Sequence, residues 1–498
     1  MTNNKKAIVI GSGFGGIGAA LRTRAKGYDV TILEQCENIG GRAQTYHKDG
    51  FKHDAGPTVI TAPFLFDELY ELFGKKREDY IEFVPLDPWY RFVFEDGTVF
   101  DYAQEIDDLL NNISALSEED KNNYLDLLKM SEEIYNIGFE KLSDVPFNSV
   151  SKMMAITPYL VKLQAYKTVW GLISSHLKND YLRRAFSIQP LLVGGNPFET
   201  TSIYCLIHYL ERKWGVWFAM GGTTAIIQGL QKLMVEEGVE IKTNISVQEI
   251  IVENKKAVGI LDHNNETHHT DIIISNADPA HLYENMIKDE NQSLSTKLKR
   301  KTFKYSMGLF VLYFGTTRRY EDVAHHTIFM SERYKSLLDD IFNKQILTED
   351  LSLYLHRPTA TDPSFAPEGQ DSFYVLAPVP NLQSGIDWDE KGQEVRDRVV
   401  SILEEHLLPG LSETITADFY KTPQDFKDNY SSMFGAGFSI APHLTQSAWF
   451  RYHNKAEGIE NLFLTGAGTH PGAGVPGVLS SAKVIEKLIP DVSLSKAA

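Results

Sequence analysis

The first 34 residues alternate between apolar and glycine-rich segments in an order that predicts a strand, a tight turn, a helix and a second strand. Residues 7–10 form a short apolar run, and glycines crowd residues 11–16. A helical spacing of small and apolar positions continues to Ala25, and residues 29–33 form a second apolar run that ends at Glu34. This alternation of short β-runs with a helix is typical of a parallel α/β unit.

The glycines of this turn have the spacing of an adenine-dinucleotide site. Gly11 would permit the tight turn, Gly13 would let the backbone approach a pyrophosphate, and Gly16 would let the helix pack closely on the strand. The pyrophosphate would lie on free amides at the helix N-terminus. Glu34 follows Gly13 by 21 positions, so its carboxylate can reach the ribose from the neighbouring strand and would repel the 2'-phosphate of NADP.

The glycine pattern alone is weak evidence, because residues 472–477 match GxGxxG as well. No second strand ending in an acid follows that match, so we reject it as a dinucleotide turn. Only the N-terminal match has strand, helix and acid in order.

Later segments add to the same α/β unit. Residues 246–252, 257–261 and 271–275 predict a β-meander whose last strand returns to the parallel sheet. Residues 461–465 predict a further strand, and a glycine-rich loop follows it. A helix is expected to begin near Val475, because Pro476 suits a first helical turn.

Two insertions separate these pieces. Apolar runs at residues 87–102, 309–314, 351–355 and 373–378 predict a mixed sheet, whereas residues 117–210 are mostly helical in pattern. Residues 152 to 184 contain six basic residues and one acidic residue, Asp180. Six apolar residues of this segment fall near one helical face. The basic residues are Lys152, Lys162, Lys167, Lys178, Arg183 and Arg184, and the apolar ones are Leu160, Leu163, Tyr166, Val169, Trp170 and Ile173. An interfacial membrane helix and an ordinary helix packed on the core both remain open.

Composition narrows the class of protein. A chain of 498 residues with 43% hydrophobic content predicts two or more lobes around a cleft. The formal net charge of -17 disfavours nucleic-acid binding. Cys36 and Cys205 have neither disulfide-scaffold nor zinc-site spacing. Because no apolar run reaches the ~20 residues of a membrane span, we expect a cytoplasmic protein, with peripheral contact at the inner face of the cell membrane left open.

Motifs along nearly the whole chain resemble those of the bacterial and fungal phytoene desaturases, which belong to an FAD-dependent, amine-oxidase-like superfamily. The first two are GGR at 40–42 and DAGPT at 54–58. The others, in the same order and with similar spacing, are LLVGGNPF (191–198), WGVWF (214–218), SNAD (275–278), AHHT (324–327), LYLHRP (353–358), YVLAPVP (374–380), LTQSAWF (444–450) and GAGTHPGAGVPG (466–477). The resemblance covers residues 7–488.

The resemblance implies an α/β fold with a discontinuous Rossmann-like FAD-binding domain, a mixed-sheet substrate domain and a helical insertion. The expected ranges are 1–80, 211–300 and 440–498 for FAD, 81–116 and 301–439 for the substrate, and 117–210 for the insertion, a candidate membrane-contacting region. FAD would be bound noncovalently. Besides Gly11, Gly13, Gly16 and Glu34, the expected cofactor residues are Gly41, Arg42, Gly56, Pro57, Thr58, Val247, Gly466, Gly468 and Val475.

The implied activity is desaturation of 15-cis-phytoene towards lycopene by hydride transfer to the flavin, with oxygen or a membrane quinone reoxidising it. Open alternatives are a desaturase of a C30 precursor, a carotenoid ketolase or oxidase, an amine oxidase, and a non-enzymatic escort protein for prenylated GTPases. The sequence reveals no catalytic base. His325, His326 and His470 are candidates, but a histidine near a turn more often has a structural role. We expect no metal site, because grouped carboxylates are lacking.

Overall fold

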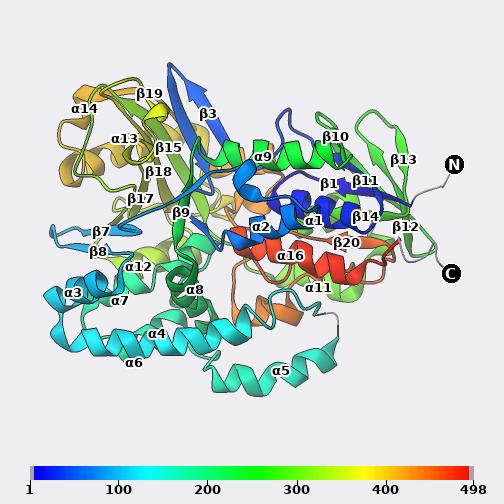
Figure 1. The fold of residues 1–498 in the computed structure, drawn as a ribbon, viewed down its shortest axis with the longest axis horizontal. Coiled ribbons are helices and arrows are strands. Elements are labelled where there is room, and N and C mark those ends of the chain that lie inside the picture. Colours follow the sequence, from blue (N-terminus) through cyan, green and yellow to red (C-terminus); the bar gives the residue numbers. More distant parts are fainter. Residues whose placement is uncertain (1–4, 148, 493–498) are drawn as a thin grey trace.

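The computed structural model describes residues 5–147 and 149–492. A parallel five-stranded sheet lies at one end of the molecule (Figure 1). Its order is β10 (Glu240–Lys242), β2 (Asp29–Leu33), β1 (Lys6–Ile10), β14 (Ile272–Ser275) and β20 (Leu462–Leu464). The sheet therefore joins three distant parts of the chain, and the strands that the sequence pattern predicts there are confirmed.

Two helices pack against each other beside this sheet, α1 (Phe14–Ala25) and α16 (Val475–Leu488). Small side chains allow their close approach, because a Cβ at Gly18 would lie 3.2 Å from the Cβ of Ala482. Both helices begin where the sequence predicts them. The meander is also present, as β11 (Val247–Glu253), β12 (Lys256–Asp262) and β13 (Thr267–His269).

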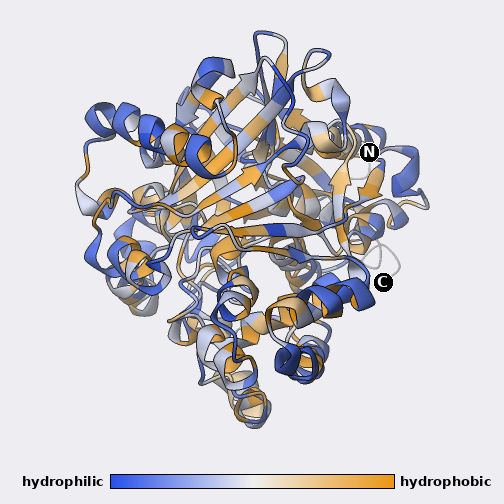
Figure 2. Ribbon diagram, turned by 90° about the vertical axis from the view of Figure 1, so that its left-hand side faces the viewer, coloured by the Kyte–Doolittle hydropathy of each residue, from blue (hydrophilic) through white to orange (hydrophobic). Residues whose placement is uncertain are grey.

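A seven-stranded mixed sheet forms the other lobe. Its order is β19 (Ile415–Lys421), β15 (Gly308–Thr316), β18 (Asp371–Val379), β17 (Leu353–His356), β16 (His326–Met330), β7 (Tyr90–Phe94) and β8 (Val99–Tyr102). Every residue of β15 is buried, as expected for an apolar strand with both faces covered. Hydrophobic strands lie inside and hydrophilic helices outside (Figure 2). The α/β class with a mixed sheet is confirmed.

Along the chain between these strands, residues 44–236 also form further helices and short strands. The helices are α2 (Phe64–Glu71), α3 (Ile106–Leu116), α4 (Glu118–Gly138), α5 (Val150–Lys162), α6 (Val169–His176), α7 (Asp180–Phe186), α8 (Leu206–Trp214) and α9 (Thr223–Glu236). The strands are β3 (Gln44–Lys48) paired with β4 (Phe51–Gly56), and β9 (Val216–Ala219) between β5 (Ile60–Thr61) and β6 (Phe83–Pro85). The division into domains stays a prediction.

The continuous apolar helical face expected between residues 160 and 173 is wrong. Helix α5 ends at Lys162, a turn with Gln164 at φ +55° follows, and α6 starts only at Val169. Leu163, Val169 and Ile173 are buried in the core. The helix pattern in the sequence thus combines two elements that the turn separates.

Candidate active site

The glycine turn after β1 lines a cavity of about 410 Å³, here called the polar cavity because its lining is more polar than that of the neighbouring cavity. Gly11 adopts φ +85°, and its amide donates to the Leu33 carbonyl. A Cβ at Gly16 would lie 2.0 Å from the Gly11 carbonyl oxygen, so only glycine lets α1 pack on the turn. Gly13 caps α1 with no side-chain hydrogen bond, which leaves the first helical amides free to bind an anion.

Glu34 lines the polar cavity beside this turn, and its side chain is held in place. One carboxylate oxygen accepts hydrogen bonds from the Ser12 amide at 2.8 Å and the Ser12 hydroxyl at 2.6 Å, and the other accepts from the Cys36 amide at 2.9 Å. A carboxylate oxygen has room for more than one donor. Glu34 can therefore still accept a hydrogen bond from a hydroxyl group of a ligand.

Arg42 lines the same cavity as a half-buried guanidinium. One terminal nitrogen donates to the Ser432 hydroxyl at 3.1 Å, whereas Nε is buried without a hydrogen-bond partner. Burial lowers the pKa of Arg42, yet a guanidinium keeps its charge at any physiological pH. Gly41 approaches the turn closely, since a Cβ there would lie 3.4 Å from Cα of Gly13. A free positive donor therefore lies beside the free amides of α1.

Asn276 is a central residue of the polar cavity that the sequence analysis did not select. It follows β14, and its side chain lies against the glycine turn and the C-terminal loop: a Cβ at Gly15 or Gly466 would lie 2.6 or 2.7 Å from its Oδ1. The residue lies in the SNAD motif, which was the available signal. Its side chain thus lies between the glycine turn and a loop whose Gly466 comes 190 residues after it in the chain.

Ten of the thirteen predicted cofactor residues line the polar cavity: Gly11, Gly13, Glu34, Gly41, Arg42, Gly56, Pro57, Val247, Gly466 and Val475. The other three lie elsewhere. Gly16 serves helix packing, and Gly468 packs against Pro279, whose Cδ would be 2.4 Å from a Cβ at that position. Thr58 lines the neighbouring cavity instead.

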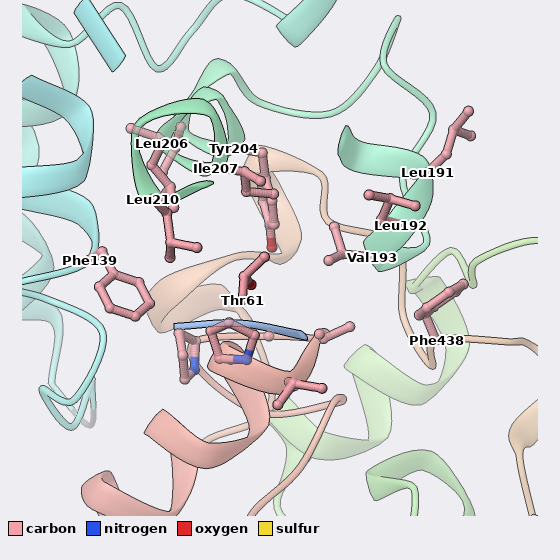
Figure 3. A pocket seen from close by; sticks show the side chains of 18 of the residues that line it. Thr61, Phe139, Leu191, Leu192, Val193, Tyr204, Leu206, Ile207, Leu210 and Phe438 are labelled. Atoms are coloured by element: carbon pink, nitrogen blue, oxygen red, sulfur yellow. The ribbon is translucent and has the colours of Figure 1, made fainter. Parts of the chain in front are cut away.

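That neighbouring cavity, here called the apolar cavity, has a volume of about 370 Å³. Aliphatic and aromatic side chains dominate its wall, and α8 contributes Leu206, Ile207 and Leu210 opposite Val193 and Phe438 (Figure 3). The two cavities share the residues at which they meet: Gly56, Pro57, Tyr374, Leu376, Phe438, Ala473, Gly474 and Val475. Helix α16 begins at this junction, and its cap Gly474 makes no side-chain hydrogen bond.

Comparison with known proteins decides the family. The profile of the family described as "Flavin containing amine oxidoreductase" matches residues 14–484. The lycopene-forming phytoene desaturase of Pantoea ananas is 44% identical over 97% of this chain and 99% of its own length. The chain belongs to the flavin-containing amine oxidoreductases and, within them, to the phytoene desaturases. It is a flavin-dependent oxidoreductase, and FAD is its cofactor.

Two further likenesses agree with this family. A 4,4'-diapophytoene desaturase of Methylomonas is 32% identical over 98% of this chain and 96% of its own length. Among solved structures, an oxidoreductase from Methanosarcina mazei has a TM-score of 0.65 at 18% identity, covering 97% of this chain and all of the other. The second likeness concerns the fold alone.

The residues of the polar cavity fit FAD. The free amides of α1 and the unpartnered Nε of Arg42 suit a pyrophosphate, and Glu34 suits a ribose. The other helix N-terminus, that of α16, lies where the polar cavity opens into the apolar one. The second GxGxxG match, residues 472–477, which we reject as a dinucleotide turn, forms the start of this helix.

The candidate histidines are all buried, and their role stays open. His325 and His326 lie together with His356, and their ligating nitrogens are within 4.8 Å of one another. The hydroxyls of Thr361 and Tyr354 lie 2.7 and 2.8 Å from Nδ1 of His325 and His326. Burial holds the pKa of both rings well below the usual value, so they are neutral. His470 lines the apolar cavity, where burial lowers its pKa to about 4. The expected absence of a metal stays a prediction.

Proposed function

We propose that this enzyme is a phytoene desaturase that introduces double bonds into 15-cis-phytoene towards lycopene. The observation that carries the proposal is the direct junction of the apolar cavity with the polar cavity at Gly474 and Val475. A hydrocarbon offers no charge or hydrogen bond to grip, so a site for it must rely on apolar lining and shape. The 44% identity to a lycopene-forming enzyme supports the same substrate.

FAD would lie in the polar cavity with its pyrophosphate at the N-terminus of α1, beside Arg42, and with its adenosine ribose at Glu34. When bound, it supplies the hydride acceptor for the oxidation. The N-terminus of α16 would face the flavin pyrimidine, where the helix dipole stabilises negative charge. The walls of the apolar cavity would exclude water and position the polyene carbons at the junction.

The test is expression of the chain in cells that accumulate phytoene, followed by pigment extraction. A red extract with the spectrum of lycopene is the expected result. Unchanged phytoene, despite soluble and flavin-loaded protein, would overturn the proposal. A parallel host that accumulates the C30 precursor separates the C40 from the C30 assignment, and product masses separate desaturation from oxygenation, because desaturation removes hydrogen pairs whereas oxygenation adds oxygen.

We infer that oxygen or a membrane quinone reoxidises the flavin, since the sequence contains one genuine dinucleotide motif and FAD would occupy it. The enzyme reduced anaerobically with phytoene would be mixed with oxygenated buffer or with quinone in liposomes. Return of the oxidised flavin spectrum with either acceptor is expected. Flavin that stays reduced with both would rule this inference out.

We also propose peripheral contact with a membrane surface at the inner face of the cell membrane, through α5 and its surroundings. Helix α5 lies at the lower edge of the molecule in Figure 1. Met154, Tyr159, Val161 and Tyr166 are exposed by 51% to 69%. The same helix supplies Met153, Ile156 and Leu160 to the apolar cavity. An apolar surface next to the cavity would let a lipid-dissolved substrate enter without crossing water.

Charge supports this contact less than the sequence suggests. Lys162 pairs with Glu133 at 3.2 Å and Arg184 with Asp180 at 2.7 Å, while the Lys152 side chain lies outside the described part of the chain. In the described residues, no helix combines the length and apolar character needed to cross a bilayer.

Liposome flotation tests the membrane contact. Replacing Met154 and Val161 with serine should reduce flotation, whereas replacing Leu294, which is 87% exposed and lies on α11 (Leu294–Thr302), should not. Equal flotation of all variants, or a wild-type protein that never floats, would contradict the proposal.

A further inference from the structure

One acidic side chain interrupts the hydrocarbon wall of the apolar cavity. Among the described residues that line it, Glu211 on α8 is the only Asp, Glu, Lys or Arg. Its side chain is 1% exposed. Burying a carboxyl group in apolar surroundings is costly unless partners compensate it. A carboxyl kept in such a place is therefore a candidate for a chemical role.

The partners of Glu211 compensate little of that cost. The Tyr90 hydroxyl donates to one carboxylate oxygen at 2.8 Å. The other oxygen, Oε2, is buried and accepts no hydrogen bond of ordinary geometry, although the Gln189 amide is near enough to favour the charged form. The Arg212 guanidinium attracts the carboxylate but forms no salt bridge with it, and its terminal nitrogens donate instead to the carbonyls of Ala103 and Gln104. One carboxylate oxygen thus has no donor at ordinary hydrogen-bond geometry, so a proton added to it breaks no such contact.

Continuous contacts link Glu211 to the junction of the two cavities. The ring of Tyr90 lies 5.9 Å from that of His326, whose Nδ1 is 2.8 Å from the Tyr354 hydroxyl. That hydroxyl is 2.6 Å from Oγ1 of Thr58, which directly follows the junction residues Gly56 and Pro57. A chain of side-chain contacts thus runs from the carboxyl, in the wall of the apolar cavity, to the residue next to the junction.

We propose that Glu211 is the catalytic base that removes the proton during desaturation. The inference rests on the proposed function. Converting a CH2–CH2 unit into CH=CH removes one hydride, which the oxidised flavin accepts, and one proton from the adjacent carbon. When the Glu211 carboxylate takes that proton, the electron pair of the broken C–H bond becomes the second bond of the alkene. The carboxylate becomes a carboxylic acid, and no other oxidant is needed.

The ionisation of Glu211 suits this role. Burial raises its pKa to about 7, so the base can both accept a proton and release it near neutral pH. The groups that face it are Tyr90, Tyr102 and Tyr124 from three other elements, Gln189, and Arg212 and His208 on its own helix. Burial raises the pKa of each tyrosine further and lowers that of His208 to about 4. Of these groups, Glu211 is the one that titrates near pH 7.

The test compares Glu211→Gln with wild type and with Glu132→Gln. Glu132 is a matched control, because like Glu211 it accepts a hydrogen bond from a tyrosine hydroxyl. Its partner is Tyr209, at 2.7 Å, and Glu132 does not line the apolar cavity. FAD content and phytoene binding should be unchanged in both variants. Flavin reduction by phytoene in an anaerobic single turnover should slow at least about 100-fold in Glu211→Gln only. The rate of flavin reduction should rise with pH through about 7 in wild type, and this rise should be absent in Glu211→Gln.

A spectroscopic readout does not depend on turnover. The infrared carbonyl band of a protonated carboxylic acid should vanish as wild-type enzyme is titrated through pH 7, and this change should be missing in Glu211→Gln but present in Glu132→Gln. The titration on wild type alone also covers a variant that fails to fold. A wild-type enzyme without desaturase activity would refute the proposed function. An active wild type whose Glu211→Gln variant reduces flavin within threefold of its rate would refute only the role of Glu211, as would a wild type without that carbonyl band.

Discussion

Replacing Glu211 with glutamine should stabilise the enzyme in a pH-dependent way. The ordinary pKa of a glutamate, 4.5, applies to the unfolded chain, whereas burial in the folded enzyme raises the pKa of Glu211 to about 7. Below pH 4.5 the group is protonated in both states and has no effect. Between these two values the unfolded chain releases its proton and the folded enzyme keeps it, so stability falls as pH rises. At about 1.4 kcal/mol per pH unit over the 2.5 units between 4.5 and 7, the loss of stability above pH 7 is about 3.5 kcal/mol.

Urea unfolding between pH 5 and pH 8, followed by tryptophan fluorescence, measures this effect. The free energy of unfolding of Glu211→Gln minus that of wild type should increase by about 2 to 3 kcal/mol across this range. It should then stay constant at higher pH, because both states are ionised there. Glu132→Gln serves as the control, since Glu132 is partly exposed to solvent. Parallel stability curves for wild type and Glu211→Gln would refute the assignment of a buried, raised pKa.

Three further outcomes follow from the two cavities. Gly13→Val should purify without FAD, because the valine side chain would block the approach of the pyrophosphate to the backbone. The control Ala25→Val, at the exposed end of α1, should retain FAD. Full flavin content of Gly13→Val, measured by absorbance, would contradict the cofactor placement. Ile207→Trp should retain FAD but lose at least tenfold in phytoene turnover by filling the apolar cavity, and unchanged product yield would argue against that cavity as the substrate site. Metal analysis of the holoenzyme should find no bound ion, whereas an equimolar ion that His326→Ala loses would overturn the sequence prediction.

The nucleotide half of the fold was predictable because its signals are local. Gly11, Gly13 and Gly16 each meet a steric demand within one turn, and the spacing to Glu34 follows from strand and helix lengths. Residues whose role depends on contacts with distant loops were harder to predict from the sequence. Asn276 contacts Gly466 across 190 residues, and no local pattern shows that two loops so far apart will meet. Thr58 belongs to a recognised motif, yet which of two adjoining cavities it lines depends on packing with Tyr354.

The helical insertion shows where periodicity misleads. Leu160 and Val169 fit one helical face on paper, but Gln164 takes a left-handed conformation and begins a new direction of the chain. A spacing pattern cannot show such a break, because glutamine is an ordinary helix residue and no glycine or proline marks the turn. Met154 and Val161, which the structure does expose, are seven residues apart and share one helical face, but this spacing is the same for an exposed and for a buried face.

The segment Glu211-Arg212-Lys213 explains why the sequence did not reveal a base. Three consecutive charges at the end of a helix are typical of a solvated face. In the structure their environments differ: Glu211 is buried in the cavity wall, and the Arg212 guanidinium lies 3.6 Å over the ring of Trp89, while Lys213 pairs with Glu140 nearer the surface. Successive helical residues point in directions about 100° apart. Three consecutive charged residues can therefore point to the core, to an interface and to the solvent. A hydrocarbon substrate needs no polar contacts, so its site leaves no polar motif in the sequence. The buried acid Glu211 is therefore the most informative residue of this site.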